Sequence, residues 1–454
     1  MSKSIAAIAT GNAAAGIGVI RISGDDAIEI AQRVFTAMDG TPLSSLAGYT
    51  ARYGSVYSDG EAFDNAVALV FRAPKSYTGE NVVEISVHGG LFIVEKTLKA
   101  VLDAGALPAG AGEFTRRAFL NGKLDLTQAE SVAELISAQG QEAAKASYNM
   151  LQGSLSNKIS AVLSSLVECS ASMAAWVDYP DEEIPELTED ALCETLTNAK
   201  NELKSLLDNY DNGQVILQGI DTAIVGRANA GKSTLMNMLS GREKSIVTHI
   251  EGTTRDIVED TVRLGGIVLH LADTAGLRKS DDVVESIGIK KAIERLESAQ
   301  LILAVFDSSL PLSDDDKMLI DSCRGKRCVA VINKTDLEQR ADLSLVENSF
   351  NEVVFISAKN HDGADMLEQA VKRTVGASEL NASQPMLANE RQRRCVANAY
   401  NHIAQALDGT QLGVTYDAIN VMVDSALDEL LSLTGKRVSD EVVNNIFSRF
   451  CVGK

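Results

Sequence analysis

The stretch Gly226-Arg227-Ala228-Asn229-Ala230-Gly231-Lys232-Ser233 has the spacing G-x-x-x-x-G-K-S and follows a short apolar run, Thr222 to Val225. In such a loop the backbone N–H groups and the N-terminus of the helix that follows converge on phosphate oxygens. Lys232 supplies a charge for the β and γ phosphates, and Ser233 offers its hydroxyl to Mg²⁺. Average composition produces this spacing by chance roughly once in a hundred chains of this length. The stretch therefore predicts a nucleotide site, formed by Asn229, Ala230, Gly231, Lys232, Ser233 and Thr234.

Three later motifs follow in the order expected of a GTPase. Asp273-Thr274-Ala275-Gly276 ends an apolar run, where the carboxylate can hold Mg²⁺ through water and Gly276 can present its N–H to the γ phosphate. Asn333-Lys334-Thr335-Asp336 decides the base, because the Asp336 carboxylate can accept from the N1–H and N2–H₂ groups of guanine, which adenine lacks. Ser357-Ala358-Lys359 ends the last strand, where a backbone N–H can meet guanine O6. Together the motifs predict a GTPase.

The residues that position the attacking water are less evident. Leu277 stands where Ras-like enzymes place a glutamine, and leucine cannot orient water. Either hydrolysis is very slow, or another polar group arrives, with Arg278 and Glu285 as candidates; the alternative for these two is a surface ion pair. Thr253 and Thr254 lie where a switch loop supplies a Mg²⁺ ligand, and the spacing leaves open which threonine does so.

Composition restricts the class of protein. The 454 residues include 42 basic and 62 acidic side chains, a net charge of −20, which repels polyanions at long range, so any nucleic-acid contact is local. Two short basic runs could provide it, although solvated helix faces explain them equally well: Arg391, Arg393 and Arg394, and Arg116, Arg117 and Lys123. The six cysteines lack zinc or disulfide spacing. With no signal peptide and no stretch approaching a membrane span, we expect a cytoplasmic protein.

The first part of the chain reads as strands. Gly18 to Ile22, Ala66 to Phe71 and Val82 to Val87 are short apolar runs separated by Gly, Asn, Asp and Pro. From Leu126 to Val177 the spacing becomes helical, and one helix face carries Ala129, Val132, Ala133 and Ile136.

An acidic, proline-containing passage, Asp178 to Pro185, interrupts the helical pattern. Helical spacing resumes from Leu192 to Tyr210, and Asp211-Asn212-Gly213 predicts its end. Further helices are expected at Leu387–Leu407, Ala418–Leu433 and Glu441–Phe450. We expect the helical segments on either side of the nucleotide motifs to pack together.

An α/β module lies between these helical segments. Between Thr222 and about Gly376, apolar strands alternate with helix-compatible stretches such as Ser233 to Leu239, as in a parallel sheet covered on both faces. The expected strands are Ala223–Val225, Val268–Ala272, Leu301–Phe306, Val329–Ile332 and Val353–Ile356.

The chain resembles the MnmE (TrmE) family of tRNA modification GTPases from end to end. The first domain carries blocks like those of that family, and so does the terminus: Gly18-Val19-Ile20-Arg21-Ile22-Ser23-Gly24, Ser76-Tyr77-Thr78-Gly79-Glu80, Val82-Val83-Glu84 with His88-Gly89-Gly90, Gly112-Glu113-Phe114-Thr115, Asn121-Gly122-Lys123-Leu124-Asp125-Leu126 and Cys451-Val452-Gly453-Lys454. The resemblance implies a multidomain α+β protein with four segments: a strand-rich folate-binding and dimerisation domain at 1–120, a helical domain built from 121–215 and 377–454, and an inserted Ras-like G domain at 216–376.

The resemblance also implies a folate site. A tetrahydrofolate derivative, the 5,10-methylene or 5-formyl form, would be contacted by Arg21, Glu84, Lys123 and Lys454. Cations suit its carboxylates or carbonyls, and a carboxylate suits the N–H edge of the pterin. Cys451 is a candidate nucleophile for C6 of uracil, with a buried structural thiol as the alternative.

For the missing glutamine, the resemblance implies dimerisation of G domains that depends on K⁺. Asn229, Thr248, Ile250 and Thr253 would hold this K⁺, and Thr254 would join Ser233 as a Mg²⁺ ligand. Glu285 would orient the attacking water, with Arg278 nearby. The GTP site then also includes Thr248, Thr253 and Thr254.

Two departures from the family pattern stand out. Gly11-Asn12-Ala13-Ala14-Ala15-Gly16 replaces a Pro/Gly-rich loop with an added basic residue, and Ala228 replaces the usual proline before Asn229. Neither removes the GKS core or Asn229.

The resulting hypothesis is a cytoplasmic homodimer that acts with the FAD-containing partner MnmG (GidA) in a heterotetramer, with NADH serving through that partner. It would modify C5 of the wobble uridine, U34, of tRNA with a carboxymethylaminomethyl-type group. Two alternatives remain: a GTPase switch that times assembly of another particle and binds no folate, and a folate-dependent aminomethyl transferase to which GTP is incidental.

Overall fold

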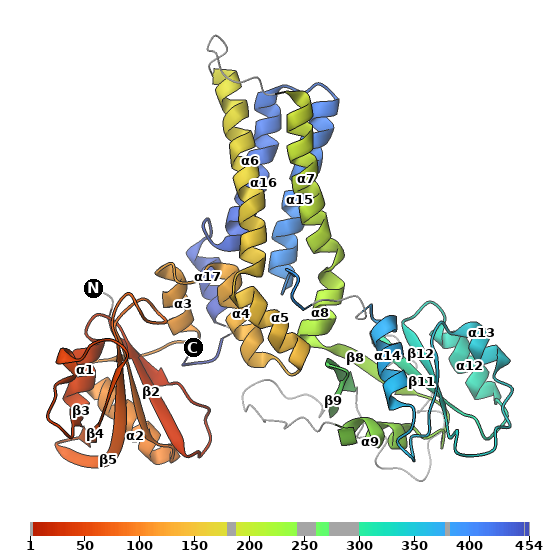
Figure 1. The fold of residues 1–454 in the computed structure, drawn as a ribbon, viewed down its shortest axis with the longest axis horizontal. Coiled ribbons are helices and arrows are strands. Elements are labelled where there is room, and N and C mark those ends of the chain that lie inside the picture. The colour runs from red at the N-terminus through yellow and green to blue at the C-terminus, as the bar shows by residue number, and fades with distance from the viewer. Residues whose placement is uncertain are drawn as a thin grey trace. The chain divides into compact units, whose positions relative to one another are not determined.

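The computed structural model describes residues 3–178, 188–242, 260–271, 299–376, 382–448 and 450–453 (Figure 1). The chain divides into two compact units. The first unit contains residues 1–133 and 427–454, and the second unit contains residues 134–426.

The first unit is built on a seven-stranded sheet with the order β3-β4-β5-β6-β2-β1-β7. Its neighbours pair antiparallel except for β1 and β7, which are parallel. The predicted strand-rich first domain is therefore confirmed. The strands are β1 Ile5–Ile8, β2 Ile17–Ser23, β3 Phe35–Ala37, β4 Thr50–Ser58, β5 Glu61–Phe71, β6 Val82–His88 and β7 Leu107–Pro108.

Alternation along the strands gives this sheet one covered face. Ile20 and Ile22 of β2 are buried in a core shared with helices α1 (Ala27–Val34) and α2 (Leu91–Asp103). Arg21, between them, must point to the opposite face, because successive side chains of a strand alternate. Its register partner on β6 is Glu84, so two charged residues lie side by side on the face away from α1 and α2.

Short helices and the chain end complete the first unit. Val452 forms an isolated antiparallel bridge with Ala111, which brings the C-terminal residues beside the start of α3. The other helices here are α3 Glu113–Leu120, α4 Leu126–Ser137 and α17 Asp440–Phe447.

The helical part of the second unit combines two distant chain segments. Helix α7 (Glu189–Asp208) packs against both α6 (Ser154–Asp178) and α15 (Glu390–Gln411). Helix α16 (Tyr416–Thr434) runs beside α6, where Ser170 donates to Asp424 at 2.9 Å (Figure 1). The predicted packing of the two helical segments is confirmed.

Two details of the helical prediction are wrong. Asp211-Asn212-Gly213 does not end a helix: α7 ends at Asp208, and these residues lie within α8 (Tyr210–Gln218). Gly213 is buried inside this helix, where a Cβ would make an ordinary contact with Met386 at 3.5 Å, so it marks no turn. Ile136 shares a helix with the buried Ala129 and Val132 but is 48% exposed.

Helix α6 also corrects the statement that no stretch approaches a membrane span. By length and composition it could cross a membrane, and 33% of its apolar window is buried inside the protein. A core helix of a soluble protein passes the same test, and α6 packs against α5 (Gln141–Leu151) and α7, so this is weak evidence for a membrane.

The α/β part of the second unit is a six-stranded sheet with the order β13-β12-β11-β8-β10-β9, parallel except for the edge strand β9. The predicted α/β insert is confirmed; the edge strand was not predicted. Helices α9 and α14 cover one face, and α12 and α13 the other. The elements are β8 Ile220–Val225, α9 Lys232–Arg242, β9 Asp260–Leu264, β10 Ile267–Leu271, β11 Leu301–Asp307, α12 Asp314–Cys323, β12 Cys328–Asn333, α13 Ser344–Ser349, β13 Val353–Phe355 and α14 Ala364–Thr374.

Candidate functional site

The phosphate-binding loop joins the end of β8 to the start of α9, at the point where the strand order reverses. Two of its residues adopt left-handed backbone conformations, Asn229 with φ of 61° and Gly231 with φ of 96°. A Cβ on Gly231 would lie 2.1 Å from Nδ2 of Asn333. Glycine at 231 is therefore required both by the backbone angle and by the close approach of β12.

Lys232 lies against the loop that it follows. Its Nζ donates to the carbonyls of Gly226 and Arg227, both at 2.7 Å. Burial lowers the pKa of Lys232, because a charged ammonium loses hydration there. A cation held inside the curve of the loop is placed to meet phosphate oxygens.

The side chain of Asn333 ties three of the predicted motifs together. Its Nδ2 donates to the carbonyl of Ala230 at 3.0 Å, and its Oδ1 accepts from the N–H of Ala358 at 3.0 Å. Asn333 is 2% exposed, so both bonds are shielded from water. The phosphate loop and the Ser357–Lys359 loop are therefore fixed relative to each other through β12.

Asp336, the carboxylate predicted to read the base, is also held in one orientation. Ser357 Oγ donates to Asp336 Oδ1 at 2.7 Å, and the N–H of Thr335 donates to the carbonyl of Ile356 at 3.2 Å. These bonds hold the Asp336 loop against the end of β13, while Lys359 remains exposed. This geometry suits a carboxylate that must meet two N–H groups of one guanine edge.

Asp307, at the end of β11, is a supporting residue that sequence reasoning missed. Its Oδ2 accepts from Lys334 Nζ at 2.6 Å and lies 3.8 Å from Arg227 Nη2 of the phosphate loop. Burial raises the pKa of Asp307, but hydrogen bonds from Lys334 and Ser309 outweigh it and hold the pKa below its ordinary value. A carboxylate that ends an otherwise apolar strand beside β8 and β12 was the available signal.

In the first unit, Arg21 and Glu84 form an ion pair, with Nε 2.8 Å from Oε1. The guanidinium also donates to the carbonyl of Gly453 at 3.4 Å and lies 5.6 Å from the ring centre of Phe114. The structure thus gathers two of the four proposed folate contacts and the chain end. On the sheet face away from α1 and α2, this place offers a cation and a carboxylate, and the guanidinium lies over the buried ring of Phe114.

Lys123 and Cys451 lie in the same unit. Lys123 Nζ donates to the carbonyl of Pro74 at 3.2 Å, and within the part of the chain that the structure describes it forms no ion pair with an acidic side chain. Cys451 is exposed, and its carbonyl accepts from the N–H of Gly112 at 3.3 Å. An exposed thiol does not fit the alternative of a buried structural cysteine.

The two basic runs are engaged in local contacts. Arg393 pairs with Glu390 at 2.6 Å and lies over the ring of Tyr210, at 5.6 Å. Arg117 pairs with Glu80 at 3.0 Å. Arg393, at 44% side-chain exposure, fits the alternative of a solvated helix face, whereas Arg117, at 13%, is buried against Glu80 and does not.

Several predicted site residues lie outside the described residues. They are Thr248, Ile250, Thr253, Thr254, Asp273, Thr274, Ala275, Gly276, Arg278, Glu285 and Lys454, together with Leu277.

Family models match nearly the whole chain. One, described as "MnmE helical domain", matches residues 126–451, and another, "GTP-binding protein TrmE N-terminus", matches residues 4–123. Two similar curated proteins are both named "tRNA modification GTPase MnmE". That of Clostridioides difficile is 37% identical over 459 residues, covering 100% of both chains. That of Symbiobacterium thermophilum is 40% identical over 456 residues, covering 100% of this chain and 99% of the relative.

Among solved structures, part of the chain is similar to two others. The FeoB G-domain of Methanococcus jannaschii is 22% identical, covers 35% of this chain and 98% of its own, and has a TM-score of 0.25. Era of Aquifex aeolicus is 25% identical, covers 40% of this chain and 66% of its own, and has a TM-score of 0.25.

Gly231→Ala should weaken binding of GDP and GTP by about tenfold or more, because alanine strains the left-handed backbone and its Cβ must displace the Asn333 amide. Titration with a fluorescent guanine nucleotide measures the effect. Gly241→Ala is the matched control, since a Cβ there meets nothing within 4 Å at an exposed position of α9. Equal affinity in the wild type and Gly231→Ala would contradict the proposed role of the loop.

Asp307→Asn should lower guanine-nucleotide affinity about tenfold, because Lys334 loses its charged partner and the base-reading loop is held less firmly. The same titration measures it. Asp342→Asn serves as the control, since Asp342 only accepts from Ser344 at an exposed site. An Asp307→Asn affinity that matches the control would show that Asp307 does not support the site.

Proposed function

Because this chain belongs to the MnmE family of tRNA modification GTPases and is a GTP hydrolase, we propose that it uses GTP hydrolysis to modify tRNA at C5 of the wobble uridine, U34. The added group is of the carboxymethylaminomethyl type, and its one-carbon unit comes from a tetrahydrofolate derivative. The likeness to tRNA-modifying relatives covers the first unit as well as the G domain, and this supports a role beyond a GTPase switch.

The observation that carries the folate part of the proposal is the Arg21–Glu84 pair. It lies on the sheet face that α1 and α2 leave open, beside the chain end. Side-chain exposures of 18% and 23% leave both groups partly accessible to a ligand. The pair can offer donors to a carbonyl or carboxylate and an acceptor to the N–H edge of a pterin. Lys123 and Lys454 supply further cations.

The nucleotide is held by residues with separate tasks. Lys232 binds the β and γ phosphates, Ser233 and Thr254 hold Mg²⁺, and Asp336 reads guanine. Mg²⁺, when bound, neutralises charge between the phosphates. The γ-phosphate side is completed by Asp273, Thr274, Ala275 and Gly276.

Hydrolysis needs a substitute for the glutamine that Leu277 replaces. Glu285 orients the attacking water, with Arg278 beside it. Asn229, Thr248, Ile250 and Thr253 bind K⁺, which supplies the charge that an arginine finger would add. The K⁺ site is completed when two G domains meet, so the working form is a homodimer.

The chain works in the cytoplasm with the FAD- and NADH-dependent partner MnmG in a heterotetramer. We keep the division into a folate-binding and dimerisation domain at 1–120, a G domain at 216–376 and a helical domain from 121–215 and 377–454. Cys451, exposed near the folate side, is the candidate nucleophile that adds to C6 of the uracil ring.

Deletion of this chain should remove the modified wobble uridine from bulk tRNA, and the wild-type chain should restore it. Mass spectrometry of tRNA nucleosides measures both. Variants Lys232→Ala and Glu84→Gln should each fail to restore it, because one disables the nucleotide site and the other the folate pair. Restoration by Lys232→Ala would favour a transferase to which GTP is incidental, and an unchanged nucleoside profile in the deletion strain would refute the proposal.

Hydrolysis of GTP should be much faster in KCl than in NaCl. Asn229→Ala should abolish the difference, but alanine also strains a backbone with φ of 61°. Asn229→Gly removes the amide while suiting that backbone, so it separates K⁺ binding from loop strain. Equal rates in the two salts for the wild type, or a retained difference in Asn229→Gly, would count against this K⁺ site.

A further inference from the structure

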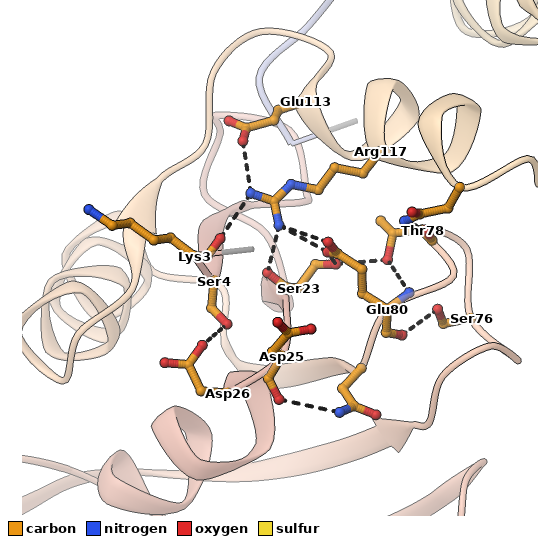
Figure 2. Close-up of polar contacts among 12 residues, drawn as sticks. Lys3, Ser4, Ser23, Asp25, Asp26, Ser76, Thr78, Glu80, Glu113 and Arg117 are labelled. Atoms are coloured by element: carbon orange, nitrogen blue, oxygen red, sulfur yellow. Dashed lines mark hydrogen bonds and ion pairs between the residues drawn. The ribbon is translucent and has the colours of Figure 1, made fainter. Parts of the chain in front are cut away.

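A largely buried guanidinium lies next to the proposed folate contacts. Arg117 Nη1 donates to Glu80 at 3.1 and 3.0 Å, and Nη2 donates to Glu113 at 3.1 Å and to the Lys3 carbonyl at 3.0 Å (Figure 2). Side-chain exposure is 13% for Arg117 and 11% for Glu80. With little water to screen it, this forked pairing is a directional link between segments rather than a surface ion pair.

Glu80, the partner of Arg117, belongs to the loop between β5 and β6 and connects this loop to β2. Its Oε2 accepts from Ser23 Oγ, at the end of β2, at 2.7 Å, and the Ser23 hydroxyl also hydrogen-bonds Thr78 at 2.7 Å (Figure 2). On the other side of the loop, Asn121 Nδ2 donates to the Thr78 carbonyl at 2.7 Å. Within the loop, Ser76 Oγ donates to the Glu80 carbonyl at 2.6 Å. The loop is thus fixed to β2 and to helix α3.

Tyr77 is the aromatic residue of this loop. Its hydroxyl lies 2.9 Å from Thr115 Oγ1 on α3, while 39% of the residue remains exposed. Phe114, the residue before Thr115, lies under the guanidinium of Arg21. Two consecutive residues of α3 therefore contact these side chains: Thr115 contacts Tyr77, and Phe114 contacts Arg21.

The charge of Arg21 also acts on Tyr77. Burial of the hydroxyl raises the pKa of Tyr77, and the Thr115 hydrogen bond and the Arg21 charge offset only part of that rise. The phenol is neutral at physiological pH and lies within electrostatic range of Arg21. Because 39% of Tyr77 is exposed, part of this flat, largely apolar side chain can be reached by a ligand.

We propose that Tyr77 is a further ligand-binding residue of the folate site, whose ring packs against a flat group of the folate, and that Arg117 is the positioning residue that holds Tyr77 there. This inference rests on the proposed folate binding. A folate has two flat groups, the pterin and the aminobenzoyl ring, and each can stack on an aromatic side chain. A loop ordered in advance loses less conformational entropy when the ligand binds.

Lysine cannot replace arginine in this role. A lysine ammonium keeps the charge but lacks the planar fork that reaches Glu80 on one side and Glu113 with the Lys3 carbonyl on the other. Arg117→Lys therefore frees the Tyr77 loop without creating a buried unpaired carboxylate.

Titration of the full-length chain with 5-formyltetrahydrofolate tests the inference. Tyr77→Leu and Arg117→Lys should each weaken binding roughly tenfold. In the double variant, Arg117→Lys should cost almost nothing beyond Tyr77→Leu, because Arg117 acts through Tyr77. Tyr77→Phe keeps the ring and should retain most of the affinity. A merely structural role of Arg117 would instead give additive losses.

Arg33→Lys is the matched control. Arg33 also donates to a backbone carbonyl, that of Ala104 at 2.7 Å, but it lies on α1, on the covered side of the sheet. The Arg33→Lys variant should leave folate affinity unchanged. Thermal melting curves of all variants report any general loss of stability. GTP hydrolysis should be unchanged throughout, since the G domain belongs to the other unit.

The outcomes separate this inference from the function on which it rests. Wild-type affinity in Tyr77→Leu would overturn the role of the ring, and additive losses in the double variant would overturn the positioning role of Arg117. Absence of binding to the wild type would overturn the proposed folate function itself, and with it this inference.

Discussion

The side-chain amide of Asn333 is the contact on which the nucleotide site depends. It donates to Ala230 and accepts from Ala358, two backbone groups on loops that follow different strands. Parallel strands bring their carboxyl ends to one edge of the sheet, but strand pairing stops where the loops begin. The buried Asn333 amide uses one donor and one acceptor, and these two bonds fix both loops in place. Because Gly231 has no side chain, there is room for this amide beside the phosphate loop.

Charge reinforces this arrangement at the next strand. The core strands β11 and β12 are buried along their whole length, so each can present polar groups only at its end. Asp307 takes that position and faces two cations, Lys334 and Arg227. A carboxylate at 3% exposure would be costly alone, and its pKa remains below the ordinary value because Lys334 and Ser309 compensate for lost hydration. The phosphate loop and the base-reading loop therefore share one anion.

The sequence predicted what depends on spacing and failed where tertiary contacts decide. The phosphate loop, the α/β insert and the strand-rich first part follow from local patterns, and the structure has them. The Asp211-Asn212-Gly213 stretch has the residues of a turn, yet it is helical and Gly213 is buried inside α8, which residue type alone does not indicate. Arg117 was counted with a basic surface run, but it is buried on Glu80, a partner that spacing cannot reveal. Asp307 was missed because an acid ending a strand has no motif of its own.

Both units solve the same physical problem in the same way. A binding loop must be exposed to meet its ligand, and exposed backbone is free to move, so its order must come from groups buried behind it. In the second unit, the uncharged side-chain amide of Asn333 orders the phosphate loop from behind. In the first unit a charged fork does it behind the Tyr77 loop, where Arg117 spans acceptors on three segments. An ion pair suits that place because Glu80 also accepts from Ser23 and Arg117 also donates to Glu113, and these hydrogen bonds offset part of the desolvation of two charges. Tyr77 and Arg21, which we propose face the ligand, can then remain partly exposed to solvent while their positions stay fixed.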